Sequence, residues 1–365
     1  MTPPALESEL AGRATSALGD ARAAIVDALA RPVAEGFPAG ASLLVVDAEG
    51  VLLRAFGGWS LVVGERIPTT RETIYDLASL TKVVATVTLA LALCERGLWT
   101  LDDPLVRWLP DYPRDETTVR QLLTHTSGLI PHREFYRHAR GVSEIRRAVV
   151  AEAAAEGLGP GQVSYSDLNY MLLGWALEQC SGVPLERLFH EIVAEPLGMQ
   201  HTGYLPSELD RRLIAATELD GDQRLTLGLV WGEVHDGNTW ALGGISGHAG
   251  LFAPADDLGR FASALLAPDR HPVLTADSLA EMTRRQAGAP PDTRALGWRL
   301  DASEWGRWPA STYWHTGFTG TSLLIAPDLG VAVVLLMGGV HPLRRLEDAD
   351  ELRRVVHRLI ADALT

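Results

Sequence analysis

A serine and a lysine three residues apart offer a nucleophile and a group that can activate it. Lysine and arginine together number 32, and Lys82 is the only lysine among them. Arginine replaces lysine at many solvated positions, but its guanidinium effectively never loses its proton, so a retained lysine suits a site that needs an amine. Lys82 follows Ser79 by nearly one helical turn, which puts both side chains on one face. A neutral amine there can take the serine proton; the alternative is a helix cap followed by a solvated lysine.

A second group, Tyr165-Ser166-Asp167, precedes an apolar stretch with helical spacing. Tyr165 is expected on an exposed loop, and the three residues alone do not decide a function. The alternative is a core tyrosine beside a helix cap, because Ser166 or Asp167 would cap well.

A third group, His315-Thr316-Gly317-Phe318, comes just before a predicted C-terminal hairpin and is expected along a strand edge. Gly317 would let a substrate approach the backbone closely. His201-Thr202-Gly203 has a similar pattern, but only His315 enters a predicted strand. The alternative for any histidine is a satisfied structural side chain.

In this order the three groups resemble the Ser-x-x-Lys, Tyr-x-Asn and Lys-Thr-Gly motifs of the serine penicillin-recognising enzymes. The chain is similar to the class C beta-lactamase family, which also holds low-molecular-mass penicillin-binding proteins, D-aminopeptidases and carboxylic esterases. The resemblance covers roughly residues 35–360, and it rests on four stretches: Tyr75–Lys82, Gln121–Leu129, Tyr165–Gly174 and His315–Thr321.

The resemblance implies a serine hydrolase that works through an acyl-enzyme. Ser79 would be the nucleophile, Lys82 and Tyr165 would share its proton, and His315 would support Tyr165 and meet the polar end of the substrate. The backbone N–H groups of Ser79 and Phe318 would hold the oxyanion. The remaining expected substrate contacts are Thr316, Gly317, Asp167 and Asn169. This chemistry needs no cofactor and no metal.

Two departures from the motifs bear on the substrate. Asp167 stands where the lactamases carry Asn, and an ionised Asp only accepts hydrogen bonds; Asn169 is the other candidate for the amide role. His315 stands where they carry Lys, and it need not be charged near neutral pH. Both departures favour small carboxylic esters or amides. The alternatives are a beta-lactamase, a D-alanyl-D-alanine carboxypeptidase, or a non-catalytic relative that binds peptidoglycan fragments or a partner protein.

The elements that must position these residues form an α+β pattern. Strands are predicted near both ends of the chain, as hairpins at 43–53 and 321–337, and mostly helical segments fill the middle. We therefore expect a beta-lactamase/transpeptidase-like fold: an antiparallel sheet flanked by terminal helices, with an inserted helical lobe. The expected division is 1–80 with 285–365 for the sheet lobe and 81–284 for the helical lobe.

Composition excludes several other classes of protein. Apolar residues make up 47% and charged residues 21%, which is typical of a globular chain. The net charge of −14 disfavours binding to nucleic acid or to anionic membranes.

No secretory or lipidation motif stands at the N-terminus, so a cytoplasmic protein is expected. Cys94 and Cys180 are expected as buried free thiols. An alternative interpretation of His235, Asp236 and His248 is that they are metal ligands.

Overall fold

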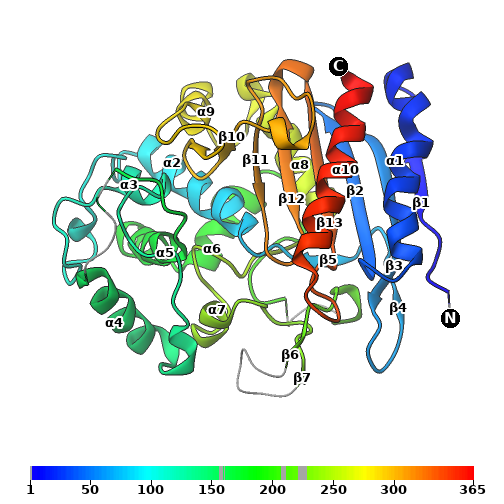
Figure 1. Cartoon of the computed structure of the whole chain (residues 1–365). Coiled ribbons are helices and arrows are strands. Elements are labelled where there is room, and N and C mark those ends of the chain that lie inside the picture. The colour runs from blue at the N-terminus through cyan, green and yellow to red at the C-terminus, as the bar shows by residue number, and fades with distance from the viewer. Residues whose placement is uncertain (1, 156–158, 160, 207–210, 221–227) are drawn as a thin grey trace.

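One antiparallel sheet organises the computed structural model, which describes residues 2–155, 159, 161–206, 211–220 and 228–365. Its strands run in the spatial order β1-β3-β2-β13-β12-β11-β10-β9, and β4 pairs with β3 (Figure 1). The strands are β1 (Glu7–Leu10), β2 (Gly40–Asp47), β3 (Gly50–Leu61), β4 (Ile67–Pro68), β9 (Thr293–Arg294), β10 (Arg299–Leu300), β11 (Tyr313–Thr316), β12 (Ser322–Ala326) and β13 (Val331–Met337).

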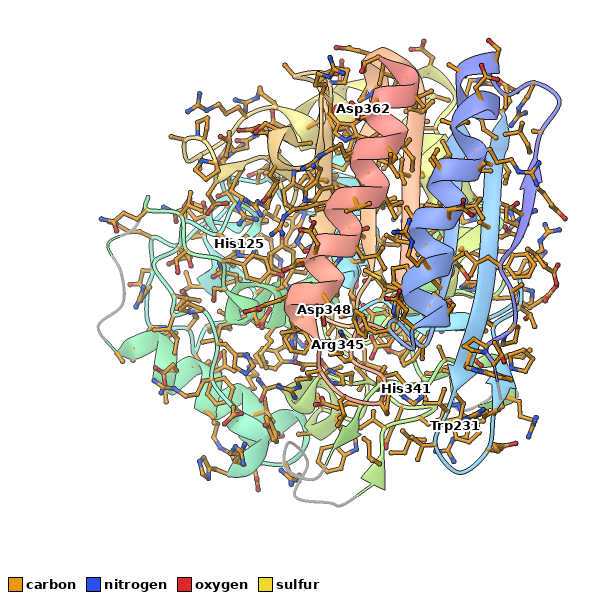
Figure 2. The ribbon with its side chains drawn as sticks, turned by 45° about the vertical axis from the view of Figure 1, so that its right-hand side comes forward. His125, Trp231, His341, Arg345, Asp348 and Asp362 are labelled. Carbon is orange, nitrogen blue, oxygen red and sulfur yellow. The ribbon has the colours of Figure 1, made fainter. Side chains whose placement is uncertain are left out.

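Both faces of the central strands are buried, which explains their continuous apolar runs. In β2, Leu43 and Val45 belong to one core, while Leu44 and Val46 belong to the other. The first core lies under helices α1 (Ser16–Ala34) and α10 (Leu346–Leu364), which pack side by side on one face (Figure 1). Helix α8 (Ala255–Leu265) packs on the opposite face. Asp348 and Asp362 mark the two ends of α10 in Figure 2.

The remaining helices form a lobe at the β9–β11 side of the sheet (Figure 1). Two short sheets accompany them, β5 (Ile74–Asp76) with β8 (Phe252–Pro254) and β6 (Leu219–Asp220) with β7 (Gly228–Leu229). The helices are α2 (Thr88–Glu95), α3 (Val119–Leu123), α4 (Gly141–Ala154), α5 (Asp167–Ser181), α6 (Leu185–Phe189), α7 (Gly237–Ala241) and α9 (Ala276–Thr283). A π-helix, Lys82–Val87, leads into α2.

The predicted fold class is confirmed: an antiparallel sheet flanked by helices, with a mostly helical lobe between its strands in sequence. Helix α8 belongs to the central segment of the chain yet packs on the sheet, and one core joins that face to the helical lobe. The lobe boundaries therefore stay a prediction. Within the described residues, every helix is too short or too polar to cross a membrane.

Candidate active site

Ser79 stands on a sharp turn between a strand and a helix. Strand β5 ends at Asp76, and Ala78 takes the left-handed backbone conformation with φ 46°, which is costly for a residue with a Cβ and typical of functional sites. The Asp76 carboxylate holds the turn by accepting a hydrogen bond from the Ala78 N–H at 2.8 Å. The helix begins immediately after Ser79, so its N-terminal dipole favours an anion forming at this point.

Lys82 is fully buried one turn further on, at the start of the π-helix. Its Nζ lies 2.9 Å from Ser79 Oγ and 3.1 Å from the carbonyl oxygen of His248. A third contact, at 2.9 Å, joins Nζ to Oδ1 of Asp167. The predicted contact between serine and lysine is therefore present, together with a carboxylate on the same amine.

Tyr165 lies in the loop before α5, as predicted, and packs among cations and other rings. Lys82 Nζ is 5.1 Å and the Arg294 guanidinium carbon 5.5 Å from its ring centroid. The His125 ring lies 4.5 Å away and the His315 ring 6.0 Å away, between centroids. Figure 2 marks His125 in the helical lobe. The tyrosine thus lies where the two lobes meet.

The third motif contacts the Ser79 turn through its backbone. A Cβ on Gly317 would lie 2.4 Å from the carbonyl oxygen of Leu77, so only glycine allows this approach. Thr321 Oγ1 donates to the same carbonyl oxygen at 3.0 Å, and Thr319 Oγ1 donates to the Asp76 carbonyl oxygen at 2.7 Å. Buried Arg353 of α10 donates to the Gly317 carbonyl oxygen at 2.7 Å. These bonds fix the end of β11 beside Ser79.

His315 lies buried on β11 as a neutral acceptor. Its Nδ1 is 2.7 Å from the carbonyl oxygen of Thr316, so the proton is assigned to Nδ1 and Nε2 keeps a lone pair. Nε2 is buried and has no hydrogen-bond partner among the described residues. Burial, followed by the charges of Lys82 and Arg294, lowers the pKa of His315 to about 3. His315 can therefore accept a hydrogen bond but does not supply a cation.

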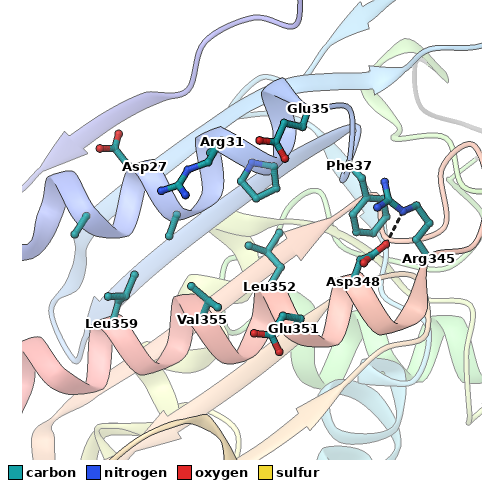
Figure 3. Close-up of a pocket in the computed structure, with 13 residues that line it drawn as sticks. Asp27, Arg31, Glu35, Phe37, Arg345, Asp348, Glu351, Leu352, Val355 and Leu359 are labelled. Carbon is teal, nitrogen blue, oxygen red and sulfur yellow. Dashed lines mark hydrogen bonds and ion pairs between the residues drawn. The ribbon is translucent and has the colours of Figure 1, made fainter.

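A cavity of about 340 Å³ brings together most of the predicted residues. It is lined by Ser79, Tyr165, His315, Thr316, Gly317 and Phe318, together with Arg294, Arg299, Leu346, Asp350 and Arg353. Phe318 is 42% exposed and packs between the His235 ring, at 5.5 Å, and the Arg344 guanidinium, at 5.3 Å. A separate hollow of about 800 Å³ lies between α1 and α10, and no motif residue lines it (Figure 3).

The arginines in the cavity were missed by sequence reasoning. Arg294 is only 5% exposed; its Nε lies 2.6 Å from Asp292 Oδ1, and its buried Nη1 has no hydrogen-bond partner among the described residues. Arg299 lies on the neighbouring strand, with its guanidinium 4.3 Å from the Trp314 ring. In a chain whose cations are almost all arginine, nothing in the local sequence distinguishes these two.

Two expected substrate contacts lie outside the lining of the cavity and stay predictions. Asp167 pairs with Lys82, and its Oδ2 lies 3.3 Å from His132 Nδ1. Asn169 is fully buried and accepts a hydrogen bond from Ser127 Oγ at 2.6 Å. Both residues lie in the first turn of α5, and neither is among the residues that line the cavity.

The alternative metal-ligand reading finds no support. His248 pairs with Asp236 at 2.9 Å, while His235 pairs with Glu218 at 2.8 Å. Within the part of the chain that the structure describes, no cluster of three metal-binding side chains occurs. Cys94 and Cys180 are free, as predicted, but they are half-buried where full burial was expected.

Known proteins share this fold and sequence pattern. A family model described as Beta-lactamase matches residues 26–358. A protein of Salmonella paratyphi B is 30% identical over 353 residues, which cover 84% of this chain and 80% of that protein. Its name is D-alanyl-D-alanine carboxypeptidase, marked there as provisional.

Two solved structures are also similar. The simvastatin synthase LovD from Aspergillus terreus has a TM-score of 0.73 at 21% identity, covering 94% of this chain and 98% of its own. SurE, in a structure with D-Leu, has a TM-score of 0.71 at 27% identity, covering 94% and 76%. The match across residues 26–358, together with the geometry around Ser79, leads to one conclusion: the chain belongs to the beta-lactamase family and is a serine hydrolase.

Proposed function

We propose that the protein hydrolyses small carboxylic esters or amides through an acyl-enzyme on Ser79. The observation that carries this proposal is the 2.9 Å contact between Lys82 Nζ and Ser79 Oγ, at the wall of a cavity that Tyr165 also lines. Ser79 Oγ bonds to the substrate carbonyl carbon while its proton passes to Lys82 or Tyr165. The proton then reaches the leaving group as its bond to carbon breaks, and water releases the acid and restores the serine.

The oxyanion of this step would be held by the backbone N–H groups of Ser79 and Phe318. The helix dipole at Ser79 and the fixed end of β11 support this assignment, because both N–H groups belong to segments held rigidly against each other. His315, with Nδ1–H bonded to the Thr316 carbonyl, would offer Nε2 to the Tyr165 hydroxyl or to a donor on the substrate.

A second candidate narrows the substrate to amides that end in a carboxylate, as in a D-alanyl peptide. Arg294 and Arg299 supply permanent cations to the cavity, and the buried Nη1 of Arg294, which has no hydrogen-bond partner among the described residues, can donate to an acceptor. The Asp167 charge, which would repel such a substrate, is paired with Lys82. The name of the Salmonella relative and the D-Leu in the SurE structure agree with this candidate.

Covalent labelling of the nucleophile and rates of substrate turnover test both candidate functions. A fluorophosphonate probe should modify the protein once, and peptide mass spectrometry should place the adduct on Ser79. Rates are then compared for a nitrophenyl ester, a chromogenic cephalosporin, a D-alanyl-D-alanine peptide and the same peptide with a C-terminal carboxamide. An adduct on another residue would overturn the assignment of the nucleophile, and equal rates for the two peptides would remove the second candidate.

A further inference from the structure

The carboxylate of Asp167 contacts the buried amine of Lys82 at the position where the motif of related enzymes has asparagine. We propose that Asp167 is a positioning residue that keeps Lys82 in its ammonium form, so that Tyr165 takes the proton of Ser79. This inference rests on the proposed role of Ser79 as nucleophile. It adds which of the two candidate groups acts as the base.

The oxygen partners of Lys82 Nζ, with the Tyr165 side chain among them, suit the donor protons of an ammonium. Ser79 Oγ, the His248 carbonyl oxygen and Asp167 Oδ1 lie within 3.1 Å of it, and each can accept a hydrogen bond. An ammonium that donates to Ser79 Oγ has no lone pair to receive the serine proton. The hydroxyl hydrogen of Ser79 must then point elsewhere, and the Tyr165 side chain is beside it in the cavity.

A neutral amine would fit the same distances with its lone pair toward Ser79, so charge decides between the two forms. Burial alone disfavours the ammonium. The Asp167 carboxylate and the Tyr165 side chain together outweigh burial, with Asp167 the larger of the two, and the pKa of Lys82 lies above its ordinary value. Burial acts against the charged form of Asp167 as well, but the Lys82 and His132 contacts hold the pKa of that carboxyl well below its usual range.

Charged and titratable groups surround this pair on every side. His132, which is 44% exposed, contacts the second oxygen of Asp167, and that hydrogen bond raises the pKa of His132. The nearby carboxylate of Asp236 is paired with His248. Other groups that face Lys82 are the rings of Tyr165 and Tyr170 and, at longer range, Arg294 and neutral His315. Asp167 is therefore the carboxylate in direct contact with the amine.

The proton balance then runs through Tyr165 alone. Lys82 and Arg294 lie beside the Tyr165 ring. The Tyr165 oxygen takes the proton from Ser79 as the bond from Oγ to the carbonyl carbon forms, and its own hydroxyl hydrogen passes to the leaving group as the scissile bond breaks. Tyr165 therefore ends the step with one hydroxyl hydrogen, and Lys82 keeps three protons throughout.

The single lysine makes a direct test possible. With ¹³Cε-labelled lysine the protein should give one lysine signal, whose chemical shift reports the charge of Lys82. In the parent protein this signal should remain in the ammonium position at pH 9. In Asp167→Asn the midpoint of its titration should fall by about two pH units or more, because the largest contribution that offsets burial is then lost. Asp111→Asn, which removes a carboxylate paired with Arg146 at 2.5 Å, is the matched control and should leave the midpoint unchanged.

The pH profile of kcat/KM in the parent tests the role of Tyr165. Activity should reach its plateau while the Lys82 signal is still wholly ammonium. The proposal would be overturned if activity rose together with the titration of Lys82. It would also be overturned if the titration midpoint of Lys82 in the parent protein lay below the ordinary lysine value. Both results can be obtained with the parent protein alone. The NMR titration does not depend on turnover, so it stays informative if the probe fails to label Ser79.

Discussion

Two residues on opposite sides of Ser79 depart from the family motif, and each departure changes the charge of the motif by one unit. The structure compensates the two changes in different ways. On the side of the helical lobe, Asp167 adds a negative charge, which is placed against buried Lys82 and away from the substrate cavity. On the side of the sheet, His315 removes a positive charge from the motif, while Arg294 and Arg299 bring cations into the same cavity.

The difference teaches that a charge in a motif does not by itself give the charge that a substrate meets. Sequence reasoning counted Asp167 as a lost hydrogen-bond donor and His315 as a lost cation, and both favoured small esters or amides. In the structure the first charge is neutralised within the protein, and the second is replaced from strands β9 and β10. This difference can be tested by substituting the residues around Ser79 in turn.

Removing the nucleophile that both sides share should have the largest effect. We expect Ser79→Ala to lower kcat by about 10³-fold or more, the scale found when a catalytic nucleophile is deleted. The side chain is small and half-buried, so the midpoint of thermal unfolding should change little. Exposed Ser143 offers the control Ser143→Ala, which should retain full activity. Substantial turnover by Ser79→Ala would show that another group forms the acyl-enzyme.

Removing the positive charge of Arg294 on the sheet side should affect a substrate that ends in a carboxylate more than one that does not. We expect Arg294→Met to lower kcat/KM for a carboxylate-ended peptide by about 10–100-fold, the range expected for losing a hydrogen bond to a charged group. The rate for the matching carboxamide should change much less. Arg270→Met, which removes an exposed arginine paired with Glu49, is the control. An equal loss for both peptides would mean that Arg294 supports Tyr165 and does not bind the substrate.

The motifs made part of this site predictable from sequence. Ser79, Lys82, Tyr165 and His315 could be found because their spacing is local and the chain contains one lysine. The contacts of Asp167 and Asn169 could not be predicted, because they depend on how the first turn of α5 packs against Lys82 and Ser127.

The same limit applies to the fold. Terminal hairpins and helices carry regular patterns, so the antiparallel sheet and α10 were predictable. The position of α8 on the sheet and of Arg294 beside Tyr165 depends on contacts between residues far apart in sequence.

The buried state of His315 should appear in the pH dependence of stability. Its pKa is about 3 in the folded protein and near 6.5 when unfolded, so the unfolded chain binds a proton first as the pH falls. Neutral His315 therefore contributes its full stability above pH 6.5, and this contribution is lost as the pH falls toward 3. Between pH 7 and pH 5 the free energy of unfolding should fall by at most about 2 kcal/mol from this cause. We expect His315→Gln to reduce the loss measured by urea unfolding at these two pH values. An unchanged loss would mean that His315 is solvated or already charged in the folded protein.

The smallest expected effect belongs to His315→Lys, which restores the motif charge on the sheet side. If Arg294 and Arg299 already supply the cation for a carboxylate, the added charge gains little. Placed in a buried position near Lys82 and Arg294, the new amine is also disfavoured by burial and by like charges. We therefore expect the ratio of kcat/KM for a cephalosporin to that for a neutral ester to change by less than about threefold, since opposing electrostatic terms of this size nearly cancel. The measurement is the ratio from pH 5.5 to 8.5 in the parent and the variant. A tenfold rise would show that the motif position sets the charge of the cavity, and that the arginines do not contact the carboxylate.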